Sequence, residues 1–146
     1  DYERRLKAQA VAEGTADRLH FVGPVPSHVI TRHLRTADVG VIAYQNICLN
    51  HEYCMPNKLF ECALAGVPLA VANLTDLRTF VTRLGIGLVM DETDPRSIAG
   101  TAMRICGESA RWRADPERVR ALAAEYGWGA QERKLLELYR SVLDAA

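Results

Sequence analysis

Apolar residues follow two different spacings along this chain, and the two spacings predict different elements. Short, nearly continuous apolar runs at 19–22, 39–43, 68–72 and 86–90 have the length of strands. Such runs are typical of parallel strands that are covered on both faces. Elsewhere apolar residues recur every three or four positions, as on one face of a helix. Helices are therefore expected at 2–13, 27–36, 56–65, 77–84, 97–105, 116–125 and 130–143.

The order of these elements predicts the fold class. Strands alternate with helices at short spacing, which predicts an α/β fold: a Rossmann-like parallel sheet with helices on both faces. Residues 45–55 are polar and irregular and are expected to form a loop. The chain opens on a helix with no strand before it. Its 146 residues fit a single domain that is long enough to bury a core.

Composition and charge argue against several classes of protein. The chain is 49% hydrophobic and 25% charged, which is ordinary for a globular domain. Its 18 basic and 18 acidic residues give no overall field that would attract nucleic acid or an anionic membrane. No apolar run approaches the ~20 residues of a membrane span, and no signal sequence opens the chain. A cytoplasmic protein is expected, and any peripheral membrane contact of the parent protein would involve parts outside this chain.

Four cysteines are present, and none forms a CxxC pair. Cys48, His51 and Cys54 are close in sequence and chemically suited to zinc, but no recognisable fourth ligand accompanies them. Free thiols in a reducing cytosol are therefore expected, with no metal site.

The most informative stretch runs from Met55 to Pro68, with Pro56 where a helix would begin. Proline is tolerated in the first turn of a helix, glycine commonly ends one in the left-handed conformation, and Pro68 prevents continuation beyond Gly66. Each residue of a helix turns by about 100° around its axis. One side of this helix should therefore carry Leu59, Phe60, Ala63 and Leu64, and the other Asn57, Lys58, Glu61 and Ala65.

The polar side of this helix permits two interpretations. An amide, an ammonium and a carboxylate gather near a helix N-terminus, whose free N–H groups and partial positive charge suit an anionic ligand such as a phosphate. Alternatively, Lys58 and Glu61 form an ordinary solvated pair three residues apart, worth ~0.2–0.5 kcal/mol. These residues alone leave both interpretations open.

Three segments in a fixed order resemble one protein family. The run PNKLFECALAGVPLAVA, preceded by ADVGVIAY, resembles the donor-binding domain of retaining nucleotide-sugar glycosyltransferases of the GT-B fold (group 1, family 4-like). RLHFVGPVPSHVITRHLRTADVGVIAY and YGWGAQERKLLELYRSVL are similar to segments before and after it. The resemblance implies that residues 1–146 are part of a C-terminal nucleotide-sugar-binding domain, truncated at its N-terminal end. The missing N-terminal domain would supply the acceptor contacts, so this fragment alone is expected to be inactive.

The resemblance also implies site residues. Glu61 matches the family's glutamate that accepts hydrogen bonds from the nucleotide ribose, a task that suits a carboxylate because it can accept from two hydroxyls. Lys58 would contribute charge toward the diphosphate, and Asn57 would either cap the helix or donate to the ligand. In the loop after the first strand, the backbone of Val25 and the side chain of Ser27 are candidate contacts to the base. The alternative for that loop is a proline-stiffened turn with an N-cap.

One position departs from the family pattern. Many members carry a second glutamate eight residues before the ribose glutamate, where it contacts the transferred sugar. Tyr53 occupies that position here, and Glu52 stands one residue earlier. Either Glu52 serves the sugar from a shifted loop, or this branch binds its sugar differently. Both residues are candidate substrate contacts, and no catalytic residue is assigned.

The function that the resemblance implies is transfer of a sugar from a nucleotide-diphosphate sugar to a glycan or lipid-linked acceptor. No cofactor is expected, and the nucleotide sugar is a substrate. A nucleotide-sugar epimerase of the same fold is the first alternative, and acid and base residues in the missing half would favour it. A non-catalytic α/β binding module is the second, and it would show no nucleotide binding.

Overall fold

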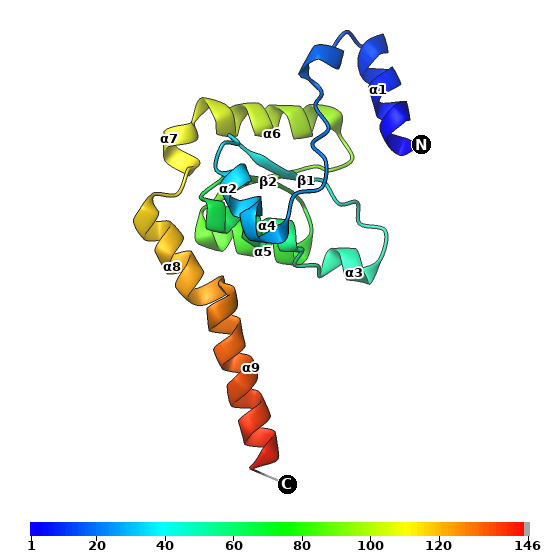
Figure 1. The fold of residues 1–146 in the computed structure, drawn as a ribbon. Coiled ribbons are helices and arrows are strands. Elements are labelled where there is room, and N and C mark those ends of the chain that lie inside the picture. Colours follow the sequence, from blue (N-terminus) through cyan, green and yellow to red (C-terminus); the bar gives the residue numbers. More distant parts are fainter. Residues whose placement is uncertain (145–146) are drawn as a thin grey trace.

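The computed structural model describes residues 1–144 as a three-stranded parallel sheet with helices around it (Figure 1). The strands are β1 (Gly40–Ile42), β2 (Leu69–Ala72) and β3 (Gly87–Met90), in the order β1-β2-β3. Gly40 lies opposite Leu69, and Leu69 lies opposite Gly87. The α-helices are α1 (Tyr2–Ala12), α2 (Ile30–Leu34), α3 (Leu49–Glu52), α4 (Asn57–Ala65), α5 (Thr75–Leu84), α6 (Pro95–Gly107), α7 (Ser109–Trp112), α8 (Pro116–Tyr126) and α9 (Trp128–Leu143), and two 3-10 turns are η1 (Ala16–Arg18) and η2 (Ser27–Val29).

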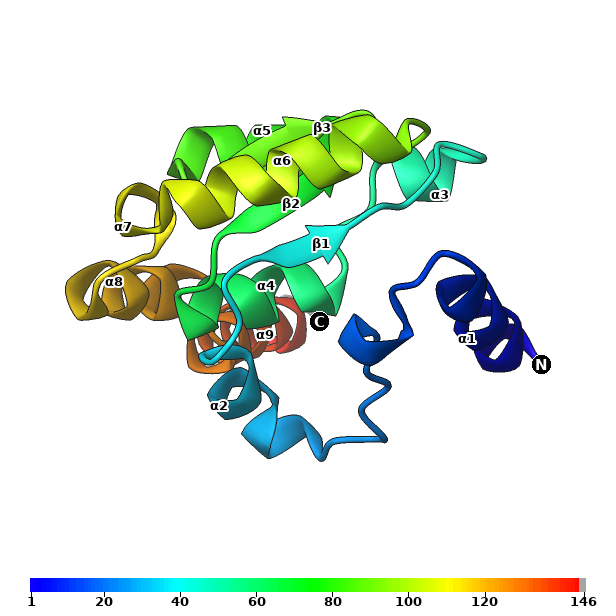
Figure 2. The ribbon, with the colours of Figure 1, turned by 90° about the horizontal axis from the view of Figure 1, so that it is seen from above.

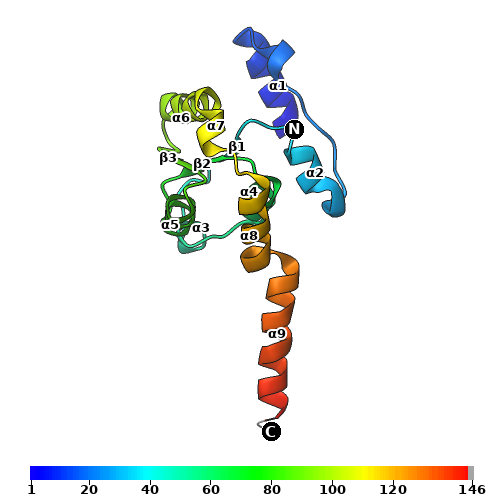
Figure 3. The ribbon, with the colours of Figure 1, turned by 90° about the vertical axis from the view of Figure 1, so that its left-hand side faces the viewer.

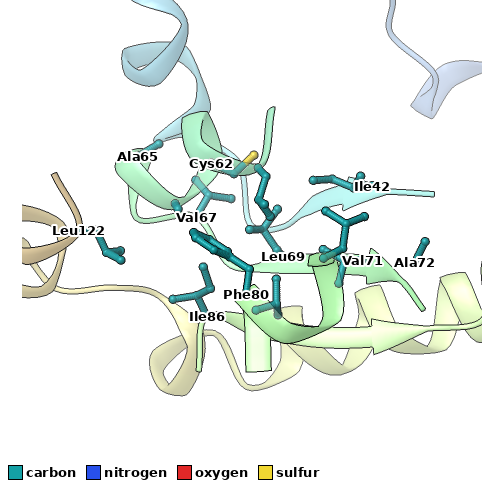
Figure 4. Close-up of a cluster of buried hydrophobic side chains, with 14 of the residues drawn as sticks. Ile42, Cys62, Ala65, Val67, Leu69, Val71, Ala72, Phe80, Ile86 and Leu122 are labelled. Carbon is teal, nitrogen blue, oxygen red and sulfur yellow. The ribbon is translucent and has the colours of Figure 1, made fainter. Parts of the chain in front are cut away.

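Helices cover both faces of the sheet, as the sequence predicts. Helices α4 and α5 lie on one face and α6 on the other (Figures 2 and 3). Because successive side chains of a strand point to opposite faces, the central strand β2 contributes to two cores. Leu69 and Val71 pack in the larger cluster with Phe80 (Figure 4), whereas Ala70 packs with Trp112 on the α6 side. All four β2 residues are buried.

The end expected for α4 is confirmed, and its start lies one residue later than expected, at Asn57. Pro56 is the N-cap, and Gly66 ends the helix with φ 74°, in the left-handed region that favours glycine. The Val67 N–H donates to the Cys62 carbonyl at 3.0 Å, which satisfies a carbonyl of the last turn. Ala65, expected on the same side as Asn57, Lys58 and Glu61, is buried, so the polar side of α4 does not extend to it. Helix α8 packs against α4, and its Val119 lies close to Gly66 at the C-terminal end of α4.

The strand expected at 19–22 is wrong. This segment is irregular, and Phe21 and Val22 expose 41% and 81% of their surface. Figure 2 shows it running from η1 to η2 apart from the sheet, which ends at β1. A strand needs a neighbour for its backbone hydrogen bonds, and the segment has none within residues 1–144.

Several helix boundaries also differ from those expected. The helix expected at 27–36 is divided into η2 and α2, and Ser27 makes no capping hydrogen bond. Helix α5 begins at Thr75 itself, and α6 begins at Pro95, where the Asp94 carboxylate accepts a hydrogen bond from the Arg96 N–H at 2.9 Å. The short helices α3 and α7 were not expected, since each spans little more than one turn.

Helix α9 projects away from the rest of the molecule (Figures 1 and 3). Several of its apolar side chains, among them Leu138, Tyr139 and Val142, are at least 60% exposed, and Ala130 is its one buried residue. Within residues 1–144, no helix combines the length and the apolar character needed to cross a membrane.

Candidate functional site

The long loop between β1 and α4 is anchored through Glu52. Its carboxylate accepts hydrogen bonds from the Thr75 N–H at 3.2 Å, from the Thr75 hydroxyl and from the Asn46 side-chain amide. The hydrogen bond from the Thr75 hydroxyl is the main reason why the pKa of Glu52 lies below its usual value. Since Thr75 begins α5, the carboxylate joins the loop to the helix that follows β2.

This anchorage gives a first prediction. In a Glu52→Gln variant the charge that strengthens these hydrogen bonds is lost, so the amide of Thr75 should exchange with solvent faster than in the unaltered protein. Because folding lowers the pKa of Glu52, its stabilising contribution is present at neutral pH and is lost as the pH falls through that lowered pKa. Hydrogen exchange of Thr75 measured at neutral pH, with Glu117→Gln on the exposed face of α8 as the control, tests the anchorage. Equal exchange in the Glu52 and control variants would contradict it.

A second set of contacts in this loop involves aromatic rings. The Tyr44 and His51 rings stack, with centroids 5.6 Å apart and planes 24° apart. His51 Nδ1 lies 2.7 Å from the carbonyl oxygen of Gln45. The Lys58 ammonium lies 4.6 Å from the centroid of the Tyr44 ring. The side chain of Lys58 is therefore directed toward the loop, rather than toward the far end of α4.

The pair expected under the ordinary interpretation of Lys58 and Glu61 is not formed. Within residues 1–144, no ion pair joins either side chain to an opposite charge. Both groups lie in the first two turns of α4, whose initial N–H groups have no partner within the helix. A free cation and a free carboxylate thus lie at the same end of one helix.

Glu61 forms part of the wall of a groove beside α4. The groove has a volume of about 430 Å³, and its walls come from three parts of the chain: Asn57, Phe60, Glu61 and Leu64 of α4, Thr31 of α2, and Tyr126, Trp128 and Gln131 of α8 and α9. Rings of Phe60, Phe80 and Tyr126 pack beside it, with centroids 5.1–6.1 Å apart. An apolar wall with carboxylate and amide groups suits a ring-shaped ligand that carries hydroxyl groups.

The structure brings together some of the residues predicted from the sequence and separates others. Asn57 and Glu61 share the groove, while Lys58 lies over Tyr44. Glu52 is engaged by Thr75 and Asn46, and the neighbouring Tyr53 is 60% exposed. Ser27 begins η2, Val25 lies two residues before it, and neither is among the residues that line the groove.

Sequence reasoning missed most of the groove. It placed Phe60 and Leu64 on the side of α4 opposite Asn57 and Glu61, but all four line the groove, and it did not identify the groove residues outside α4. Tyr126 and Trp128 flank Gly127, where α8 ends and α9 begins. The sequence did contain a signal for these two residues, namely aromatic residues on either side of a glycine between two helices. Such a junction can present aromatic rings at the surface. Nothing in the sequence indicated that this junction meets α4.

The cysteines contribute no nucleophile to the groove. Burial raises the pKa of Cys62 to about 11, so its thiol stays protonated at neutral pH. Cys48 and Cys106 are exposed, and all four thiols are free. Among residues 1–144, no three cysteine, histidine or acidic side chains gather closely enough to hold a metal ion.

Comparison with known proteins gives sequence relatives and a similar solved structure. The chain is 29% identical over 147 residues to the D-inositol 3-phosphate glycosyltransferase of Thermobispora bispora, covering 95% of this chain and 31% of the relative. It is also 29% identical over 135 residues to the protein of the same name from Streptosporangium roseum, covering 92% and 29%. Sucrose-phosphate synthase from Thermosynechococcus elongatus has a similar structure, with a TM-score of 0.75 and 24% identity over 98% of this chain and 35% of that one. No protein-family model matches the chain.

These matches confirm the resemblance to the C-terminal domain of GT-B glycosyltransferases and the α/β fold expected with it. The chain spans about 30% of the length of the curated relatives that it matches. Retention of configuration, implied by the sequence resemblance, stays a prediction.

Proposed function

We propose that this chain is the donor-binding part of a glycosyltransferase that transfers a sugar from a nucleotide-diphosphate sugar to an acceptor. The rest of the parent protein would supply the acceptor domain. One observation carries the proposal: Asn57, Lys58 and Glu61 all lie in the first two turns of α4, no side chain caps that end of the helix, and neither charged group has an ion-pair partner within residues 1–144. Relatives named as glycosyltransferases support the same reaction class.

The arrangement suggests how the donor lies. The nucleoside would occupy the groove, where the Glu61 carboxylate can accept hydrogen bonds from the ribose hydroxyls. Phe60 and Leu64 would contact the apolar side of its rings. The diphosphate would then lie at the N-terminal end of α4, close to the Lys58 ammonium. Ser27 and the backbone of Val25 remain candidate contacts to the base, and Glu52 and Tyr53 remain candidates on the sugar side.

The chemical contribution of this half would be electrostatic and positional. Negative charge develops on the diphosphate as the bond to the sugar breaks. The free N–H groups of α4 and the Lys58 ammonium would stabilise that charge in place. Binding the nucleoside in a fixed groove would hold the sugar carbon facing the acceptor. We propose that this half needs neither a metal nor a cofactor.

Calorimetric titration of the full-length protein with a nucleoside, its monophosphate and its diphosphate tests the proposal. We expect the diphosphate to bind about tenfold or more tighter than the nucleoside, because charge-assisted hydrogen bonds are the stronger ones. Turnover of the corresponding nucleotide sugar should transfer the sugar to an acceptor. Absence of nucleotide binding would favour a non-catalytic module, and inversion at a sugar carbon without transfer would favour an epimerase.

A further inference from the structure

Tyr44 occupies a central place in the loop between β1 and α4. It lies two residues beyond the end of β1, is half-buried and packs against the larger hydrophobic cluster. Its ring contacts both the His51 ring, at 5.6 Å between centroids, and the Lys58 ammonium, at 4.6 Å from the centroid. The Tyr44 ring is therefore held in place by the core, and the exposed Lys58 side chain lies against it.

The partner ring is fixed as well. His51 Nδ1 lies at hydrogen-bonding distance, 2.7 Å, from the Gln45 carbonyl oxygen. The next residue, Glu52, is hydrogen-bonded to Thr75 at the start of α5. The stack of Tyr44 on His51 is thus held by the core, by the loop backbone and by a neighbouring helix.

The nature of the contact with Lys58 matters for its charge. A lysine that is held by a carboxylate is neutralised by it, so little of its field remains for a ligand. A neutral ring attracts the ammonium through its quadrupole and leaves the positive charge in place. Within residues 1–144, Lys58 has no ion-pair partner, so the ring is what restrains its flexible stem.

We propose that Tyr44 and His51 are positioning residues that hold the Lys58 ammonium at the N-terminal end of α4 for the diphosphate of the donor. This inference rests on the proposed function. It assigns a role in ligand binding to two residues that do not themselves contact the nucleotide. The role is specific to the diphosphate, because the nucleoside would lie in the groove, and Lys58 is not among the residues that line it.

A double-mutant cycle in the full-length protein tests the inference, with uridine and guanosine and their diphosphates as the titrants. Tyr44→Leu should weaken diphosphate binding about two- to fivefold, as expected for an exposed cation–π contact, and leave nucleoside binding unchanged. His51→Ala should act in the same direction with a smaller effect. Tyr44→Phe keeps the ring and should bind the diphosphate like the unaltered protein.

The decisive comparison is with Lys58→Met. If Tyr44 acts through Lys58, adding Tyr44→Leu to Lys58→Met should weaken diphosphate binding no further. Additive losses, or an equal loss for nucleoside and diphosphate, would overturn the positioning role while leaving the proposed function intact. An unaltered protein that binds none of these nucleotides would overturn the proposed function, and the inference with it.

Discussion

Alanine at Gly87 should destabilise the protein by about 3 kcal/mol or more, a large share of a typical domain stability of ~5–15 kcal/mol. Gly87 begins β3 and lies opposite Leu69. A Cβ atom there would stand 1.9 Å from the Leu69 carbonyl oxygen and 2.7 Å from its carbonyl carbon. Both are backbone atoms of the central strand, so no side-chain rotation can relieve the overlap.

Chemical denaturation of the full-length protein measures this effect. Gly100→Ala is the matched control, since Gly100 lies within α6 and a Cβ there would meet nothing within 4 Å. That control should be stabilised by about 0.5–1 kcal/mol, because alanine is the better helix former. A Gly87→Ala protein that unfolds at the same denaturant concentration as the unaltered protein would show that β2 and β3 do not approach this closely.

Alanine at Glu61 should weaken nucleotide binding by roughly 10- to 150-fold, which corresponds to ~1.5–3 kcal/mol for hydrogen bonds to a charged group. The Glu61 carboxylate is half-buried in the groove wall and has no ion-pair partner within residues 1–144. Because it is expected to bind the ribose, the loss should be the same for a nucleoside and for its diphosphate. Variants of Lys58 should instead affect the diphosphate alone.

Calorimetry with both ligands separates these two roles. Glu61→Gln retains the volume and one acceptor oxygen and should show an intermediate loss. Glu117→Ala removes an exposed carboxylate from α8, away from the groove, and should leave both affinities unchanged. Unchanged affinity in the Glu61→Ala protein would remove Glu61 from the ribose site.

The parts of the fold that could be predicted from the sequence are those decided by local chemistry. Pro56 and Gly66 limit α4 through their own backbone preferences, so its expected boundaries are correct to within one residue. The apolar run at 68–72 forms a strand that is buried on both faces, as its composition indicates. The similar run at 19–22 forms none, because its pattern does not reveal whether a neighbouring strand is there to pair with it.

The residues of the candidate site likewise fall into two groups, those that could be predicted from the sequence and those that could not. Asn57 and Glu61 could be found because one helix carries them at a recognisable spacing. Helical periodicity also placed Ala65 beside them, but that side chain is buried, and the pattern contains no information about the elements that cover it. The contribution of Trp128 and Thr31 could not be predicted, since those segments meet α4 only in the folded chain. Likewise, the contact between Lys58 and Tyr44 depends on the path of the loop between them.

The two tryptophans of this chain differ sharply in their surroundings. Trp112 is 8% exposed in the core on the α6 side of the sheet, whereas Trp128 is 73% exposed at the groove. Indole emission depends on the polarity around the ring and is altered by a ligand that covers it. The pair therefore supplies two intrinsic fluorophores whose emission adds in one spectrum. Replacing Trp128 by phenylalanine leaves the buried ring, which is sensitive to unfolding, and replacing Trp112 leaves the exposed ring at the groove, which is sensitive to what covers it.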